Sequence, residues 1–540
     1  MLVTLLPGVR LLVTAIAPGG ELDLSGFIDR LTTTSALRAA WHTLDTAFFG
    51  ALLAMAIGAP FAIAVAMTDM PGARPVGFLL LLPLMIAPQV TALAWLNLLG
   101  PSSALLGALG LAPPPGTANP LLGRGGIILL YGVQHAPIVF VALRAGLAAI
   151  PRDLVEAARA SGASQTRVLV SIILPLVRPY LVGAAALAFV SGVGNFGIPA
   201  FLGMPVNYHT LPTLIYQQMS SFGPSLLPQM ASLSVLIAVL AVLGLVAQSA
   251  ALRHRGARFA GGAPARISLG VWRWPAALFA TAVIIMILIL PVLALISTAL
   301  VPTYGVPLTF ETATLANFSE VLTRQASTLR AFRNSTLLAG SAAAILAIAA
   351  IPVAVALTFI RPRSARLAQG LLELPYALPG IVLAIACILL FLRPLPVIGS
   401  LYATVWIILI AYLMRFAILA LRPVAAAVER IPRDLGEAAA ACGAAAPRRM
   451  MTITLPLVAP AAAAGALLVF MSAFNELTVS ALLWSGGVET LGVVLFSLEE
   501  AGLGTHAAAV AVTTIAVAVL LLGLLDRLGR KLPAGVLPWR

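Results

Sequence analysis

The chain has 540 residues, of which 61% are hydrophobic and only 9% are charged, and its mean hydropathy is +1.05. A water-soluble protein of this length needs far more charge on its surface, so the composition excludes one. The net charge of +14 is better explained by arginine-rich loops that orient membrane helices than by binding of nucleic acid.

Runs of about 20 apolar residues, the length that crosses a bilayer as a helix, recur along the whole chain. We predict an all-α polytopic membrane protein of two tandem six-helix domains in parallel orientation. The first helix is short and contains Arg10, so we expect either that Met1 is not the natural start or that this helix is vestigial. The predicted spans are 2–17, 44–68, 76–99, 125–149, 179–202 and 228–251, then 274–300, 334–360, 368–391, 401–427, 461–484 and 506–525.

Arginines concentrate in the loops on one side of these spans, which the positive-inside rule makes cytoplasmic. Both termini are then expected to be cytoplasmic. The segment 252–273 is basic and glycine-rich and lacks apolar periodicity, which is typical of a linker. We therefore predict a first domain at 1–251, a cytoplasmic linker at 252–273, a second domain at 274–528 and a cytoplasmic tail at 529–540.

One polar stretch occurs twice, and each matched residue is displaced by the same 281 positions. The copies are Pro151-Arg-Asp-Leu-Val-Glu-Ala-Ala158, Gly162 and Ile172-Ile-Leu-Pro175, then Pro432-Arg-Asp-Leu-Gly-Glu-Ala-Ala439, Gly443 and Ile453-Thr-Leu-Pro456. Acids in the first turn and alanines favour a thin short helix, and the glycine can end it in the left-handed conformation. A second short helix is predicted to about Ile173, with Pro175 breaking it before the next span. The prediction is a small helical hairpin that projects from the membrane.

A single Glu-Ala-Ala triplet arises easily by chance in an alanine-rich chain, but two copies in constant register do not. Both copies match, without departure, the signature of permease subunits of binding-protein-dependent ABC importers, and nearly the whole chain resembles two such permease domains fused. The resemblance implies that each hairpin is a coupling helix seated in a cytoplasmic ATP-binding subunit, of which we expect two copies. The implied coupling residues are Glu156, Ala157, Ala158, Gly162, Glu437, Ala438, Ala439 and Gly443.

The segments around Asn195 and Asn475 resemble the fused permeases of the ferric-iron importers, while thiamine, aminoethylphosphonate and polyamine permeases are similar as well. The resemblance implies a solute-binding protein outside the membrane as a second partner, and a location in the bacterial inner membrane.

The chain lacks the Gly-x-x-x-x-Gly-Lys-Ser/Thr loop that binds nucleotide phosphates, since Lys531 is its only lysine and lies outside such a motif. We therefore expect a transport subunit that is not an enzyme, with ATP hydrolysed by a partner. The histidines and cysteines show no metal-ligand spacing, and no cofactor is expected. An ion-coupled secondary transporter is the alternative of another class.

Polar residues inside predicted spans usually face a cavity or a partner helix, because their burial in hydrocarbon is costly. Gln89, Gln134, Asn195 and Glu476 are the candidates for a translocation path, and Asn195 and Glu476 again differ by 281 positions. The alternative is an interhelical hydrogen bond, or an ion pair between Glu476 and Arg415. Prolines at similar places in the third and ninth spans, Pro83 and Pro88 with Pro375 and Pro379, indicate kinked helices or simple packing irregularities.

Overall fold

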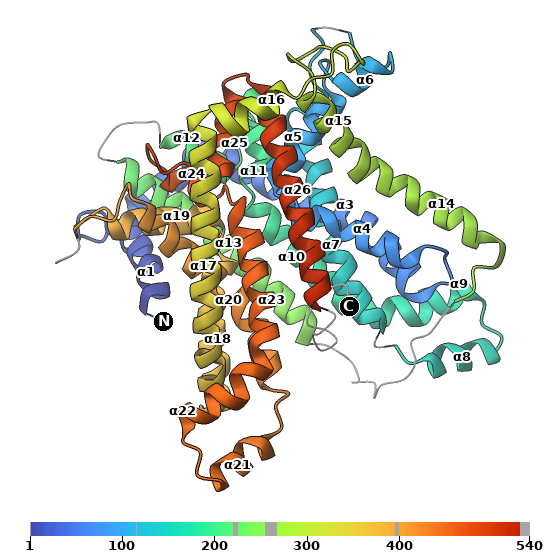
Figure 1. The fold of residues 1–540 in the computed structure, drawn as a ribbon, viewed down its shortest axis with the longest axis vertical. Helices are drawn as coiled ribbons and strands as arrows, with labels where there is room; N and C mark the ends of the chain where they lie inside the picture. Colours follow the sequence, from blue (N-terminus) through green and yellow to red (C-terminus); the bar gives the residue numbers. More distant parts are fainter. Residues whose placement is uncertain are drawn as a thin grey trace.

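The computed structural model describes residues 2–114, 116–148, 150–219, 225–253, 267–394 and 399–529. These residues form helices and loops without a named strand (Figure 1). Ten of the described helices are long and apolar enough to cross a membrane, and a bent helix pair makes an eleventh. With the short apolar helix Leu6–Ile16 they match the twelve predicted segments. The all-α polytopic fold is confirmed.

The first half runs from α1 to α13. Its helices are α1 (Leu2–Ile16), α2 (Leu24–Thr32), α3 (Thr34–Met67), α4 (Ala73–Met85), α5 (Pro88–Leu99), α6 (Ala104–Ala108), α7 (Arg124–Ala148), α8 (Arg152–Ala160), α9 (Gln165–Val168), the π-turn η1 (Leu169–Ile173), α10 (Leu174–Val193), α11 (Gly197–Leu202), the 3-10 turn η2 (Met204–Val206), α12 (Leu211–Gln218) and α13 (Leu226–Arg253).

The second half repeats this order. It contains the 3-10 turn η3 (Gly270–Trp272), α14 (Arg273–Ile284), the π-turn η4 (Ile285–Ile289), α15 (Leu290–Ala299), α16 (Ala316–Ser319), the π-turn η5 (Glu320–Arg324), α17 (Ala326–Phe359), α18 (Pro362–Ala377), α19 (Gly380–Phe391), α20 (Val405–Val428), α21 (Arg433–Ala441), α22 (Ala446–Arg449), the π-turn η6 (Met450–Thr454), α23 (Leu455–Phe474), α24 (Ser480–Leu483), α25 (Leu491–Glu500) and α26 (Gly504–Gly529).

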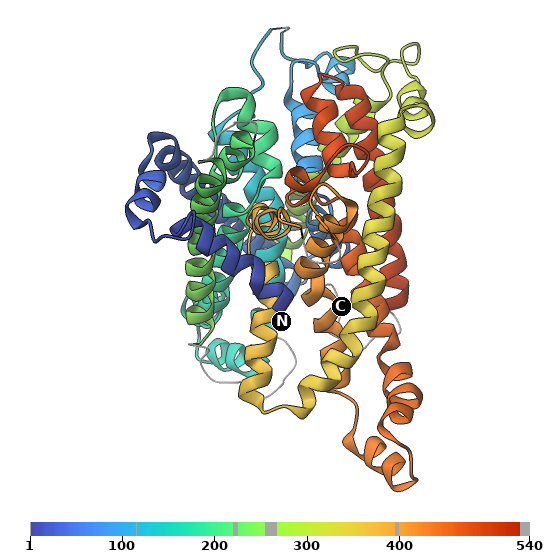
Figure 2. The same ribbon diagram turned by 90° about the vertical axis from the view of Figure 1, so that its left-hand side faces the viewer.

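The first helix of each half packs on the other half. Helix α1 contacts α13 of its own half and α19 of the second half, and α15 contacts α26 of its own half and α5 of the first. Figures 1 and 2 show α1 beside α19, and Figure 1 shows α14, which continues through η4 into α15, leaning away from the bundle. The two halves are therefore interlocked by an exchange of their first helices.

Four predicted spans are broken, so their prediction as single helices was wrong. Helix α4 gives way to α5 at Ile86 and Ala87, and α18 and α19 meet at an angle of 99°. The residue before a proline avoids the helical conformation, and Ala87 precedes Pro88 while Leu378 precedes Pro379. Both residues are extended, with ψ of 143° and 139°. The spans predicted at 179–202 and 461–484 also break, after Val193 and after Phe474.

The helices α3 and α17 begin at Thr34 and Ala326, about ten residues before the predicted spans. Their first turns carry polar residues such as Arg38 and His42, which lower the hydropathy although the helix is continuous. The apolar run marks the part of a helix suited to hydrocarbon, and the helix itself extends further.

The chain returns from the linker onto the first half. Residues 254–266 of the predicted linker, and 530–540 of the predicted tail, lie outside the described residues. In the described end of the predicted linker, the Ile267 amide donates to the Met67 carbonyl at 2.6 Å, and Asp69 accepts from the Leu269 amide at 2.8 Å and from the Ser268 hydroxyl at 3.3 Å. The Gln165 side chain of α9 donates to the Ser268 carbonyl at 3.0 Å. The start of the second half is thereby fastened to the first.

We expect Asp69→Ala to speed hydrogen exchange at the Leu269 amide, because that amide loses its acceptor. The Leu269 N–H is the main cause that lowers the pKa of Asp69. The bond is therefore intact at neutral pH and lost as the pH falls through the lowered pKa. Exchange mass spectrometry, corrected for the intrinsic pH dependence, measures both effects. Asp69→Asn is the control, since it keeps an acceptor that does not titrate, and equal exchange in wild type and Asp69→Ala would contradict the bond.

Candidate functional site

The two copies of the repeated stretch form matching hairpins that project from the bundle (Figure 1). In the first, α8 ends at Ala160, Gly162 follows with a φ of +85°, and Ser164 caps the N-terminus of α9. In the second, α21 ends at Ala441, Gly443 follows with a φ of +79°, and α22 comes next. Both glycines adopt the left-handed conformation that other residues avoid. The predicted turns therefore have the expected geometry.

The glutamates of both hairpins are exposed. Glu156 pairs with Arg152 one turn earlier on α8, and both side chains are more than half exposed. An exposed pair of this kind contributes little to stability, so Glu156 can exchange its partner at low cost. In each copy the first alanine after the glutamate, Ala157 or Ala438, is exposed, and the second, Ala158 or Ala439, is half-buried.

The hairpins differ in what holds their two helices together. In the first, Val155 of α8 and Val168 of α9 are both buried. At the same positions the second copy has Gly436 and Arg449, and the Arg449 guanidinium donates to the Gly436 carbonyl at 3.1 Å. Two buried apolar side chains in one copy are thus replaced by a charge-assisted hydrogen bond in the other.

Each hairpin exposes a leucine that sequence reasoning missed. Leu154 and Leu435 are 38% and 46% exposed and differ by the same 281 positions. A large apolar side chain left in water on a small polar hairpin suggests a surface covered by a partner. The constant offset was the available signal, because both leucines stand in the repeated stretch.

The second helix of each hairpin continues into the next span, which corrects the predicted break at Pro175. A single helix runs over Gln165–Val193, and its counterpart over Ala446–Phe474. In each, a π-turn (η1 or η6) comes immediately before the Leu-Pro pair. Proline lacks an amide hydrogen and its ring collides with the carbonyl four residues earlier. The wider π-turn accommodates that loss without ending the helix. Each hairpin is therefore continuous with a membrane span.

Gln134 supports the broken third span and is almost fully buried. Its amide group donates to the carbonyls of Pro83 at 2.7 Å and Ile86 at 3.1 Å, which the break between α4 and α5 leaves without helical partners. Its counterpart 281 positions later is Arg415, which donates to the Leu378 carbonyl at the break before α19, at 3.5 Å. Both side chains thus donate to backbone carbonyls at the broken third spans.

Asn195 and Glu476 also act on local backbone, at the broken fifth spans. The Asn195 side chain accepts from the Ile198 amide at 3.0 Å, and Glu476 accepts from the Val479 amide at 2.9 Å. Each therefore caps the short helix that follows, α11 or α24. Among the residues the structure describes, Glu476 and Arg415 form no ion pair.

Gln89 joins the two halves. Its side chain donates to the Asn475 carbonyl of the second half at 2.8 Å. Gly194 of the first half lies against Pro379 of the second, so that a Cβ at Gly194 would come within 2.9 Å of the proline ring. We call this contact surface between the halves, with Gln89, Asn475, Gly194 and Pro379, the seam. The third-span break of each half therefore contacts the fifth-span break of the other half.

An aromatic cluster fills the seam beside these breaks. Phe496 of α25 lies 6.0 Å from Phe196, 5.5 Å from Phe201 and 5.7 Å from Tyr216, measured between ring centroids. The three partners belong to the first half. The packed rings close the seam between the halves at this level.

A cavity of about 550 Å³ lies beyond this cluster, with Phe201 and Phe496 in its wall. It is built from both halves, by the ends of α5, α11 and α25, the turn η2 and the adjoining loops, on the side opposite the hairpins. Its ionisable residues are Tyr304, Glu499 and Glu500. Burial raises the pKa of both glutamates, and burial together with the nearby Glu499 raises the pKa of Tyr304 to about 12. No basic side chain is among the described residues that line it.

We expect Gln134→Leu to lower the free energy of unfolding by about 1–3 kcal/mol, because buried carbonyls at the break lose their donor. The shift of the thermal unfolding midpoint in one detergent measures this. Asn97→Leu is the matched control. Asn97 is equally buried, but its amide donates to Leu93 four residues earlier in an unbroken helix, where the backbone already supplies a donor. Equal losses in the two variants would contradict a special role at the break.

Comparison with known proteins agrees with this architecture. The chain is 28% identical over 507 residues to the probable ABC transporter permease protein y4fN of Sinorhizobium fredii, covering 91% of this chain and 87% of that one. It is 26% identical to the Fe(3+)-transport system permease protein FbpB 2 of Haemophilus influenzae, covering 69% and 70%. It is 27% identical to the putative 2-aminoethylphosphonate transport system permease protein PhnU of Salmonella typhi, covering 37% and 69%.

The model of one protein family matches the chain twice, at residues 49–255 and 344–532. Each match contains one hairpin, one broken third span and one broken fifth span. The chain belongs to the family of binding-protein-dependent transport system inner membrane components.

Proposed function

We propose that this permease imports ferric iron delivered by a solute-binding protein, and that ATP is hydrolysed by separate subunits docked on the two hairpins. The observation that carries the proposal is the matched pair of exposed hairpins, each continuous with a span that ends at the seam between the halves. A push on a hairpin can therefore reach the closed seam through one helix. Because the chain belongs to a family of binding-protein-dependent transport components, we do not propose an ion-coupled secondary transporter.

We place the hairpins and both termini in the cytoplasm. Arg152, Arg159 and Arg167 accompany the first hairpin, and Arg448 and Arg449 accompany the second, which supports that side by the positive-inside rule. The acidic cavity then opens to the outside, where the binding protein releases its solute.

Iron is supported by a relative and by the charge of the outer cavity. The Fe(3+)-transport permease FbpB 2 matches more than two thirds of the chain. Glu499 and Glu500 line the cavity, which lacks a described basic residue in its wall, so it attracts cations and repels anions. An anionic solute, such as an aminoethylphosphonate with its phosphonate group, is less well suited. Thiamine and polyamines are cations and stand as the alternatives.

The test is the ATPase activity of the complex reconstituted with its ATP-binding subunits. We expect stimulation by the ferric-loaded binding protein, and its loss in Glu156→Ala/Glu437→Ala, because the hairpins no longer engage. Stimulation only by a binding protein loaded with thiamine, a polyamine or aminoethylphosphonate would keep the permease and discard iron. Failure of any ATP-binding subunit to associate would overturn the coupling role.

The exposed leucines give a second test of the same docking. Full burial of a leucine side chain contributes about 1.5–3 kcal/mol, and docking can bury only the 38% of Leu154 and 46% of Leu435 that are exposed. Leu154→Ser and Leu435→Ser should therefore each weaken association with the ATP-binding subunit by about threefold to tenfold. Leu111→Ser is the control, since Leu111 is exposed in a loop on the opposite side. A binding titration measures the change, and an equal effect of Leu111→Ser would contradict docking at the hairpins.

A further inference from the structure

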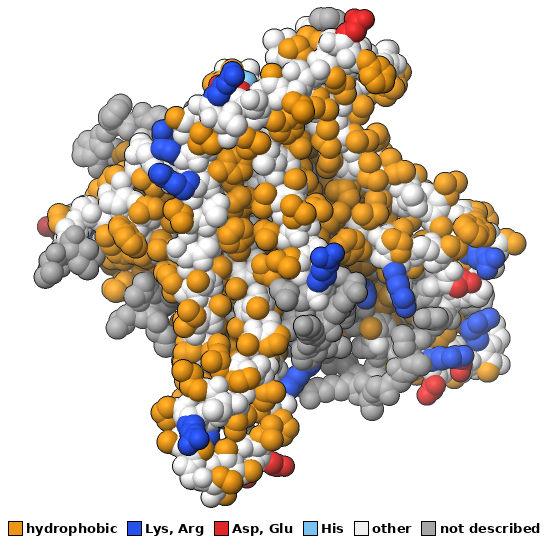
Figure 3. Space-filling view, in the orientation of Figure 1, with side chains coloured by type: hydrophobic (Ala, Val, Ile, Leu, Met, Phe, Trp, Pro, Cys, Tyr) orange, Lys and Arg blue, Asp and Glu red, His pale blue; other side chains and the backbone are white. Residues whose placement is uncertain are grey.

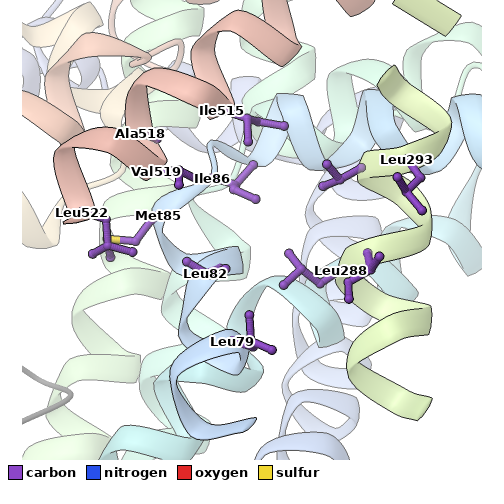
Figure 4. Close-up of a pocket in the computed structure, with 12 residues that line it drawn as sticks. Leu79, Leu82, Met85, Ile86, Leu288, Leu293, Ile515, Ala518, Val519 and Leu522 are labelled. Carbon is purple, nitrogen blue, oxygen red and sulfur yellow. The ribbon is translucent and has the colours of Figure 1, made fainter. Parts of the chain in front are cut away.

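A second cavity, of about 230 Å³, lies between the halves on the hairpin side of the seam. Its walls come from α4 of the first half and from η4, α15 and α26 of the second. Figure 4 shows Leu79, Leu82 and Ile86 facing Leu288 and Leu293 on one side and Ile515 and Leu522 on the other. All twelve lining residues are aliphatic or methionine. The cavity therefore offers only apolar contacts.

Water is a poor occupant for this cavity. Apolar cavities stay dry, and even one of about 150 Å³ binds a hydrocarbon such as benzene. Each wall belongs to a segment long and apolar enough to cross the membrane or to the short apolar helix α4. At that depth the abundant apolar molecule is the acyl chain of a phospholipid.

The cavity is open toward the bilayer. Helix α14 leans away from the bundle in Figure 1, and Figure 3 shows a hollow between α26 and the α14–α15 helix with hydrophobic atoms on its walls. Leu278, Phe279 and Met286 on α14 and η4 are exposed, as expected for side chains in lipid. A chain from the surrounding bilayer can therefore enter from the side.

Basic residues lie at the hairpin end of the cavity. Arg74 is the second residue of α4 and precedes Leu79 by five positions, and Arg527 follows Leu522 by five positions. Five helical residues span about 7.5 Å. Both arginines are exposed, and neither forms an ion pair with a described carboxylate. Trp272 and Trp274 are exposed at the start of α14, where aromatic residues mark the membrane interface.

We propose that an anionic phospholipid binds here, with one acyl chain in the cavity between α4, α15 and α26 and its headgroup phosphate near Arg74 and Arg527. Basic residues beside gaps between membrane helices on this side suit anionic headgroups. Because the cavity walls belong to both halves and include Met85 and Ile86 at the break, the acyl chain contacts the seam that must move during transport. This inference does not depend on the identity of the imported solute.

The test uses the full chain in nanodiscs that contain phosphatidylglycerol with a photoreactive group in its acyl chain. Irradiation and peptide mapping should place the label on α4, α15 and α26 at the cavity residues. Phosphatidylcholine with the same reactive group should label these peptides less. Label spread evenly over the outer faces of α17 and α26, or equal labelling by the two lipids, would overturn the proposal, as would cross-linking to another protein at the cavity.

Two kinds of variant sharpen the test. Ala518→Phe fills the cavity and should abolish most of the labelling, whereas Leu337→Phe, at an exposed position on α17, should leave it unchanged. Arg74→Gln and Arg527→Gln should each reduce the preference for phosphatidylglycerol by about fivefold, the factor for one basic residue near an anionic surface. These two lie at the surface and leave the packing intact. Arg363→Gln is their control, and an effect equal to theirs would contradict the headgroup site.

Discussion

A backbone carbonyl released inside a bilayer must find a hydrogen-bond donor, because no water is there to supply one. This constraint governs the fold, since the chain interrupts its third and fifth spans in both halves. At each third-span break a side chain from the neighbouring helix, Gln134 or Arg415, donates to the freed carbonyls. At each fifth-span break Asn195 or Glu476 accepts from the freed amides. Because these hydrogen bonds satisfy the freed backbone groups, the breaks are tolerated inside the membrane and can contact each other at the seam.

The side chains that pair with the backbone at the breaks occupy equivalent positions in the two halves but differ in chemistry. The first half uses two neutral amides, and the second uses an arginine and a glutamate at the equivalent positions. The hairpins show a similar divergence, with a buried valine pair in one and the Arg449–Gly436 bond in the other. Each half needs an interaction at the same place, but a different side chain supplies it. Fusion of the halves in one chain allows this, because each half then always meets the same partner.

The sequence sufficed to predict the parts that repeat or that depend on hydropathy. The constant offset of 281 residues located both hairpins and their glycine turns, and apolar runs located the spans. Matching prolines indicated kinks in the third span of each half, where the structure has full breaks. The breaks of the fifth spans escaped prediction, because hydropathy does not change where a helix ends inside the membrane. Asn195 and Glu476 occupy equivalent positions and each accepts from a nearby amide, and the residue types that cap a helix are the same as those that can line a path. Only coordinates show which backbone amide each one meets.

The exchange of first helices and the cavity of Figure 4 could not be predicted either. The cavity residues are ordinary aliphatic side chains and one methionine, and they come from three segments that are about 200 positions apart along the chain. A helix face that packs on another helix has the same apolar sequence pattern as a face that contacts lipid, because both are apolar in hydrocarbon. The sequence therefore does not show which faces pack together.

The π-turns that precede the Leu-Pro pairs have a mechanical consequence. Helix α10 extends 20 residues from η1 to Val193, which makes it a rigid arm about 30 Å long. A tilt of one degree about its base moves the far end sideways by about 0.5 Å. Gly194, next to that end, touches Pro379, so an angular change of a few degrees at the base is enough to lift the two surfaces out of van der Waals contact. The same leverage exists in α23, and small rotations at the two bases therefore set the width of the opening.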